Sequence, residues 1–216
     1  SEKFGIFLRE FKNIHSINHP CICQAIGFNS QKNGIKPNNV NSTISLFFEY
    51  VEFSLKDCLN FSIISNTLKI RIIVEILHGL IYLHKKGIVY RNLNIDCILL
   101  NSVFNVKIKN KFIENSLRKD EKYDFRFEYE KFFISPEILN HQSYGDKADI
   151  YSFGVILYYI VFGKPEKYLS CEFLTSITNS SIPQCCVDLI IKCTSFNPND
   201  RPSFEYILNY VRENNY

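Results

Sequence analysis

Residues 89–100, Val-Tyr-Arg-Asn-Leu-Asn-Ile-Asp-Cys-Ile-Leu-Leu, place several polar side chains directly before an apolar run. The guanidinium of Arg91 can bind a phosphate through two parallel hydrogen bonds. Asn92 can orient a hydroxyl group but cannot accept its proton, and the thiol of Cys97 is a poor ligand for a hard cation. Asn110 offers a carbonyl oxygen without charge, whereas Mg²⁺ is usually held by one or two carboxylates. These groups can position a substrate, but they supply no general base and no carboxylate ligand.

The first fifty residues predict one helix and two strands around this polar cluster. Apolar positions within 4–17 recur near helical spacing, and Pro20 ends the helix because proline cannot continue one. Residues 21–28 read as a strand, and 43–51 as a second strand that is apolar enough to be buried on both faces. The Asn-rich stretch 29–41 between them reads as an exposed loop.

The remaining sequence predicts a mainly helical region. A long amphipathic helix is expected over 67–86, ended by a glycine in the left-handed conformation. Two short strands are expected near 98–100 and 106–108. Residues 109–134 show no clear period and read as a long loop, and three or four helices follow from position 146 onward.

Composition places limits on the kind of protein. At 216 residues and 46% hydrophobic, the chain can bury one sizeable core. The net charge is +3, and charges of both signs are interspersed, so the sequence shows no basic stripe that would bind nucleic acid. The longest apolar stretch, 150–162, is shorter than the ~20 residues that a helix needs to span a bilayer. The eight cysteines lack the spacing of a zinc site, and no signal peptide opens the chain. We therefore expect reduced thiols, a cytoplasmic location and no metal site.

Segment 89–100 resembles the catalytic loop of eukaryotic protein kinases, whose pattern is H-R-D-L-K-P-x-N-I-L-L. In this register Asn92 replaces the proton-accepting Asp, and Asn94 replaces the Lys that contacts phosphate. Cys97 replaces the Asn that binds magnesium, and Asn110 stands where the Asp of D-F-G is expected. The resemblance thus keeps the frame of the loop while each of these chemical groups is changed.

Further motifs of the same family follow in the same order along the chain. They are 7–10 with 19–20 for the C helix and its H-P exit, 46–51 for the hinge strand, 135–137 for A-P-E, 146–155 for D-K-x-D-V-Y-S-F-G-V, and 197–204 for D-P-x-x-R-P-S-F. The last two patterns are most similar to the tyrosine-kinase-like branch. The resemblance implies an α+β, protein kinase-like fold with a partial N-lobe at 1–51 and a mostly helical C-lobe at 52–216. The chain begins inside the expected C helix, so we expect it to lack the glycine-rich loop and the nucleotide-binding lysine.

The resemblance also implies roles for residues outside the catalytic loop. Glu10 is expected to be the C-helix glutamate, Glu137 and Arg201 are expected to form an ion pair, and Asp149 is expected to bind the backbone of the Arg91 turn. A remnant adenine pocket would be formed by Phe48 at the gatekeeper position, by the backbone of Glu49 and Val51, and by Leu99 as its floor. Arg91 could also bind a phosphorylated residue, with Ser116, Tyr123 and Tyr129 as candidates.

These observations predict a catalytically inactive kinase domain, a pseudokinase, that serves as a signalling scaffold or allosteric binding module. Its expected partners are proteins, such as an active kinase or its substrates, with no nucleic acid, no membrane, no cofactor, and ATP binding that is weak or absent. An atypical active Ser/Thr or Tyr kinase that uses an upstream segment is a first alternative. In that case Asp96, Glu130, Lys109 and Lys111 could supply replacement charges. A decayed kinase gene fragment is the second alternative.

Overall fold

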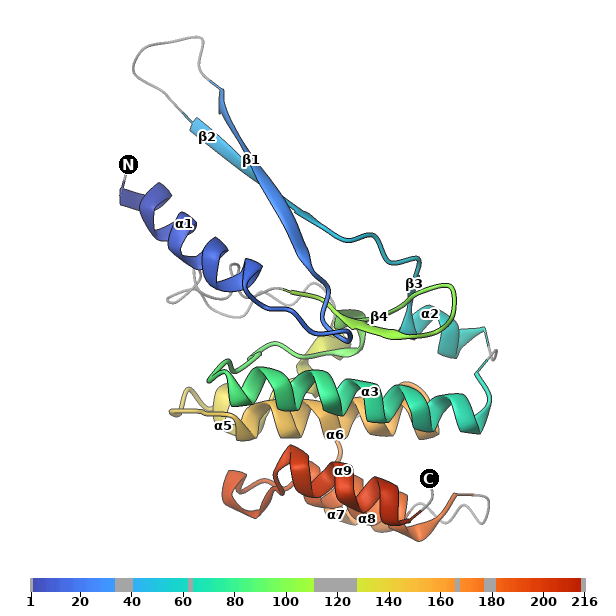
Figure 1. Ribbon diagram of the computed structural model, residues 1–216. Helices are drawn as coiled ribbons and strands as arrows, with labels where there is room; N and C mark the ends of the chain where they lie inside the picture. The colour runs from blue at the N-terminus through green and yellow to red at the C-terminus, as the bar shows by residue number, and fades with distance from the viewer. Residues whose placement is uncertain are drawn as a thin grey trace.

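The computed structural model describes residues 2–33, 41–61, 64–110, 128–165, 168–176 and 182–214 (Figure 1). Strands and helices mix in one α+β fold, as the sequence predicted. In chain order the described elements are α1 (Glu2–His15), β1 (Ala25–Asn33), β2 (Asn41–Phe48), β3 (Phe53–Ser54), α2 (Leu55–Asn60), α3 (Asn66–Lys85), the 3₁₀ helix η1 (Ile95–Cys97), β4 (Ile98–Leu100), β5 (Val106–Ile108), η2 (Glu128–Phe133), α5 (Pro136–Leu139), α6 (Lys147–Phe162), α7 (Cys171–Ser176), α8 (Gln184–Cys193), η3 (Pro198–Asp200) and α9 (Phe204–Glu213).

Strands β1 and β2 form an antiparallel hairpin that projects away from the helices, with α1 beside it (Figure 1). Aromatic packing holds α1 on the hairpin, because the ring of Phe28 lies edge-on to Phe7 at 5.2 Å and to Phe11 at 4.9 Å. Such aromatic pairs stabilise beyond their buried area. The helix therefore covers one face of the two-stranded sheet.

Two predictions about this hairpin were wrong. β1 continues through residues 29–33, which the sequence placed in a loop, because each of these residues pairs with a residue of β2. Backbone pairing has overridden the low strand propensity of asparagine and lysine there. β2 is also not buried on both faces, since the side chain of Phe47 is 51% exposed. The expectation of burial failed because α1 covers only one face of the hairpin.

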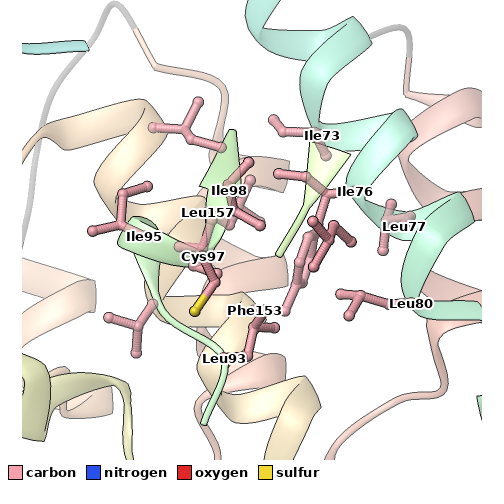
Figure 2. Close-up of a cluster of buried hydrophobic side chains, with 14 of the residues drawn as sticks. Ile73, Ile76, Leu77, Leu80, Leu93, Ile95, Cys97, Ile98, Phe153 and Leu157 are labelled. Atoms are coloured by element: carbon pink, nitrogen blue, oxygen red, sulfur yellow. The ribbon is translucent and has the colours of Figure 1, made fainter. Parts of the chain in front are cut away.

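The helical part is built around α3 and α6. A side-chain cap on Ser65, which accepts a hydrogen bond from the backbone N–H of Leu68, begins α3, and Gly87 follows its end with φ of +71°, as predicted. Residues 148–160 of α6 are all buried, so the apolar stretch predicted to be a core helix is one. Figure 2 shows the core between these helices, with labelled side chains Ile73, Ile76, Leu77 and Leu80 of α3, Phe153 and Leu157 of α6, and Leu93, Ile95, Cys97 and Ile98. None of the helices in the described part of the chain has the length and apolar character needed to cross a membrane.

A close approach of α6 and α8 explains why α6 carries a glycine in its buried middle. A Cβ atom on Gly154 would lie 2.6 Å from the Cβ of Cys193 and 2.9 Å from the Cγ2 of Thr194. The two backbones can pack at this distance only without a side chain. The glycine of the S-F-G pattern is therefore a packing residue in this chain.

The three-stranded sheet β3–β4–β5 positions the loops that precede and follow it. The sequence predicted β4 and β5 with the bounds that the structure has, and their antiparallel register pairs Ile98 with Ile108. Helix α3 holds the connecting turn, because the carboxylate of Glu75 accepts a hydrogen bond from the backbone N–H of Val106. Residues 128–133, predicted as loop, form the 3₁₀ helix η2.

Arg201 connects α5, the start of α6 and the segment after α8. Its side chain is 1% exposed, and it forms a bidentate ion pair with Glu137 at 2.7 and 2.8 Å, the pair that the resemblance implied. The remaining N–H groups donate to the backbone carbonyls of Ser195, Phe196 and Lys147. All five donors of the guanidinium are therefore used. Burial is the largest single influence and would raise the pKa of Glu137, but the hydrogen bonds from Arg201, the other hydrogen bonds to the carboxylate and the charge of Arg201 together outweigh it and lower that pKa below 4.5.

We expect Arg201→Met to lower the free energy of unfolding by about 3–5 kcal/mol, because the buried carboxylate of Glu137 would lose its partner. Urea unfolding followed by circular dichroism measures this loss. The matched control is Lys192→Met, since that cation is exposed, lies beside the rings of Tyr206 and Tyr210, donates to the Tyr206 hydroxyl and has no carboxylate partner among the described ion pairs. Equal losses in both variants would contradict the prediction.

The ion pair also predicts a pH dependence. A lowered carboxyl pKa contributes stability above its unfolded value, and this contribution is lost as the pH falls through the folded value. The difference in unfolding free energy between wild type and Glu137→Gln should therefore stay constant between about pH 5.5 and 7 and shrink as the pH falls below 4.5. The exposed substitution Glu172→Gln is the control. A difference that grows toward acidic pH would have the wrong sign.

Candidate functional site

The carboxylate of Asp149 in α6 holds the turn that carries the candidate catalytic residues. Its oxygens accept hydrogen bonds from the backbone N–H groups of Tyr90 at 2.7 Å and Arg91 at 2.8 Å. The imidazole of His84 lies 2.8 Å from the same carboxylate, which is fully buried. A buried carboxylate is stable here because each oxygen has at least one donor. The contact with the Arg91 turn is the one that the resemblance implied.

Arg91 has a left-handed backbone, with φ of +70°, and an exposed side chain. This conformation is unusual for a residue with a Cβ atom, and the two hydrogen bonds to Asp149 maintain it. The guanidinium lies over the ring of Tyr144, 5.9 Å from its centroid. Arg91 therefore stands at the surface beside an aromatic ring. Of the candidate phosphorylation sites, Ser116 and Tyr123 lie outside the described residues, as does the side chain of Tyr129.

Cys97 is part of the hydrophobic core. Its side chain is 0% exposed, and its sulfur lies among apolar side chains of α3 and α6 (Figure 2). The thiol donates to the side-chain oxygen of Asn94 at 3.2 Å and lies 3.5 Å from the backbone carbonyl of Asn92. The Asn94 side chain also caps η1 by accepting from the backbone N–H of Asp96. Cys97 and Asn94 thus form a local packing unit.

Asn110 is buried without a hydrogen-bond partner. It is 6% exposed, and neither the nitrogen nor the oxygen of its amide is paired in the described structure. The residue before it is fixed from two sides, because the Lys109 N–H donates to the Cys97 carbonyl and the Tyr90 hydroxyl donates to the Lys109 carbonyl, both at 2.8 Å. The catalytic loop and the end of β5 are therefore brought together at Lys109. Lys111 and the aromatic position after it lie outside the described residues.

Asp96, the replacement carboxylate nearest to Cys97 in sequence, forms an ion pair. Its carboxylate lies 3.3 Å from the ammonium of Lys56 in α2. Glu130, another candidate replacement, lies in η2 and is half-buried. Among the described residues, no three His, Cys, Asp or Glu side chains are grouped so that they could hold a metal ion. The residues at the two expected magnesium positions fit Mg²⁺ poorly, because one is a buried thiol, the other is an uncharged amide, and neither is a carboxylate.

Glu49 joins the hinge to the strands on both sides of it. Its carboxylate accepts hydrogen bonds from the backbone N–H of Gln24 at 2.8 Å and from the ammonium of Lys107 at 2.9 Å. Its backbone carbonyl lies 3.6 Å from the thiol of Cys23, whose pKa burial raises to about 11 with a further contribution from the Glu49 charge. That thiol is therefore protonated near neutral pH and is not a nucleophile.

The other residues of the expected adenine pocket, Phe48, Val51 and Leu99, are all half-buried. Phe48 pairs with Ala25 at the end of the hairpin, and Leu99 pairs with Lys107. Phe48 thus ends β2 and Leu99 lies in β4, and the ion pair of Glu49 with Lys107 joins the end of β2 to β5, the neighbour of β4. The side chain of Glu10, expected to face this region from α1, lies outside the described residues.

Three residues of this site did not emerge from the sequence: Tyr90, His84 and Lys107. Tyr90 stands at the His position of the H-R-D pattern, and the sequence alone assigned it no role. Its hydroxyl is nevertheless buried with the rest of the side chain, and a buried tyrosine hydroxyl needs a partner. That rule could have identified Tyr90 as a residue that fixes the neighbouring backbone. No sequence pattern identified His84 or Lys107, because their partners, Asp149 and Glu49, are remote in sequence.

Comparison with known proteins agrees with this architecture. A family model described as the protein kinase domain matches residues 1–211. Two probable serine/threonine-protein kinases of Dictyostelium discoideum are similar, one 32% identical over 184 residues and 78% of this chain, the other 27% identical over 217 residues and 95% of it. The serine/threonine-protein kinase PLK4 of Drosophila willistoni is 31% identical over 150 residues, 64% of this chain.

The chain spans only 17%, 16% and 19% of the length of these three relatives. The similarity therefore concerns one domain, while the family match runs along nearly the whole chain. The matched region includes the anchored turn at Asp149, the hinge at Glu49 and the ion pair of Glu137 with Arg201. This chain belongs to the protein kinase domain family.

Proposed function

We propose that this domain is a catalytically inactive kinase domain of the tyrosine-kinase-like branch that works as a protein-binding module. The observation that carries the proposal is the position of Cys97. Its thiol is fully buried in the apolar core and hydrogen-bonded to Asn94, where an active family member has a magnesium-binding asparagine. A side chain held in this way has no atom to offer to a hard cation.

The other two chemical positions support the same conclusion. Phosphoryl transfer depends on a positioned nucleophile and on neutralisation of the phosphate charge by metal ions and cationic groups. Asn92 cannot remove a proton, which by itself costs roughly 10²–10⁴ in rate. Asn110 brings no negative charge to the metal position and is 6% exposed. Because these losses affect different parts of the reaction, their effects combine.

The retained interactions favour a folded binding module over a decayed fragment. Arg201 has partners for all five N–H groups, and the buried Asp149 is fully bonded. Breaking either arrangement would leave a buried charge without a partner, which is strongly destabilising. These interactions contribute to stability whether or not the domain transfers phosphate. Their presence supports selection for the fold.

A protein partner is favoured by the composition of the exposed α8–α9 face. The ammonium of Lys192 lies 5.7 Å from the ring centroid of Tyr206 and 5.5 Å from that of Tyr210, and Tyr206 is 46% exposed. Tyrosine is enriched at protein interfaces. Seven of the eight cysteines are free thiols, and the side chain of the eighth, Cys171, lies outside the described residues; free thiols suit the reducing cytoplasm that we propose as the location.

An active serine/threonine kinase remains the second candidate, favoured by the printed names of the similar proteins. In that case Lys109, directly before Asn110, could supply positive charge near the phosphates. The two candidates predict different results for two measurements. These are the effect of Mg²⁺ on the melting temperature with ATP, and the effect of an Asn92 substitution on phosphoryl transfer. The following two experiments use that difference.

We expect a titration with ATP to produce no magnesium-dependent rise in melting temperature. The reason is that Cys97 offers no oxygen ligand and Asn110 offers only an uncharged amide oxygen, so Mg²⁺ gains no carboxylate contact that would stabilise the folded state. Differential scanning fluorimetry with ATP, in Mg²⁺ and in EDTA, measures both curves. A shift present only with Mg²⁺ would contradict the proposal, and the loss of that shift in Asn110→Leu would locate the metal ligand.

We also expect no phosphoryl transfer above background with labelled ATP, Mg²⁺ and a general protein substrate. The matched control is Asn92→Ala, which removes the side-chain amide at the general-base position. Because an amide cannot accept the proton, wild type and variant should give the same background signal. A wild-type signal that falls at least tenfold in the variant would establish the active-kinase alternative.

A further inference from the structure

A pocket of about 560 Å³ lies in the helical part, away from the hinge and the catalytic loop. It is lined by α5, the middle of α6, the segment before α7, and the C-terminal end of α8 with the residues that follow it. Seven of its eleven lining residues are apolar or aromatic: Pro136, Leu139, Tyr151, Tyr168, Leu169, Ile191 and Phe196. The volume falls in the range of pockets that bind small molecules.

Arg201 holds two walls of this pocket in place. Through its ion pair with Glu137 it fixes α5, which carries Pro136 and Leu139 into the lining. Through the backbone carbonyls of Ser195 and Phe196 it fixes the chain after α8, which forms the opposite wall. The same buried guanidinium thus sets the distance between the walls. The pocket is therefore formed before a ligand arrives, which lowers the entropic cost of binding.

The third wall is held by aromatic contacts. The ring of Tyr168 lies edge-on to that of Phe132 in η2, with centroids 5.2 Å apart. The ring of Tyr151, at the base, lies 5.1 Å from the guanidinium of Arg201. Burial raises the pKa of Tyr151 to about 12, so its hydroxyl stays neutral. The pocket thus combines rigid rings with polar groups that carry no charge.

The lining indicates the chemistry of the ligand. None of the eleven residues is Asp, Glu, Lys, Arg or His, so a charged ligand would lose its hydration without gaining a partner. Three aromatic rings, those of Tyr151, Tyr168 and Phe196, can pack against a flat molecule. Phe196 is 74% exposed, which is unusual for a large apolar side chain and leaves apolar surface in water until a ligand covers it.

We propose that this pocket binds an uncharged, ring-containing small molecule between α5 and the C-terminal end of α8. The site does not depend on the hinge, on the catalytic loop or on magnesium. It is also independent of whether the domain transfers phosphate. Ligand contact with Tyr168 would reach η2 directly, because Tyr168 and Phe132 are packed together.

The neutral fluorescent probe N-phenyl-1-naphthylamine tests the proposal on the whole chain. We expect a saturable, one-to-one rise in fluorescence and a rise in melting temperature for wild type. Leu139→Trp and Ile191→Trp fill the pocket from opposite walls, and each should weaken probe binding at least tenfold. Two filling variants are used so that one remains informative if the other fails to fold, which circular dichroism would reveal.

The matched control is Phe61→Ser. Phe61 is 72% exposed, close to the 74% of Phe196, but it lies after α2 and outside the pocket. The control should bind the probe as wild type does, whereas Phe196→Ser should bind it several-fold more weakly. The proposal is overturned if wild type shows no saturable binding, if both folded tryptophan variants bind normally, or if Phe61→Ser loses binding as Phe196→Ser does.

Discussion

The buried carboxylate of Asp149 is the interaction on which the candidate site depends. It ties α6 to the backbone of Tyr90 and Arg91 and to the side chain of His84 in α3. Without these donors the carboxylate could not remain buried, and without the carboxylate Arg91 would have no reason to keep a left-handed backbone. The Arg91 turn also positions Tyr90, whose hydroxyl donates a hydrogen bond to the backbone carbonyl of Lys109 and so fixes the end of β5. One charge in the core therefore determines where two remote loops meet.

The framework and the chemistry of this site are physically separable. The framework uses buried charges and backbone donors, whose loss would destabilise the fold by several kcal/mol. The chemistry is set by the side chains at Asn92, Asn94 and Asn110, which are neutral amides. Neither the ion pair of Glu137 with Arg201 nor the hydrogen bonds of Asp149 involve these three side chains, so the amides can change without breaking that framework. This asymmetry explains how the loop keeps its shape with different reactive groups.

The sequence predicted the parts of the fold that depend on local or strongly patterned signals. The bounds of β4 and β5 and the end of α3 at Gly87 were predicted correctly, because they rest on short apolar runs and on a glycine cap. The extent of β1 and the exposure of Phe47 were not, because pairing and burial are decided by neighbouring elements. The roles of Tyr90 and His84 were missed for the same reason. Their partners, Lys109 and Asp149, are 19 and 65 positions away.

Cys97 shows why a cysteine at the position of the family's metal-binding asparagine need not harm the fold. A free cysteine behaves as a small apolar side chain with a weak donor, so it is well suited to full burial. Here the thiol packs with the apolar side chains of α3 and α6 and gives its one weak hydrogen bond to Asn94 (Figure 2). An asparagine in the same place would bring two amide donors and an acceptor that all need partners. Relative to the family pattern, the position thus carries a group suited to the core in place of one suited to a cation, which is consistent with the binding role that we propose.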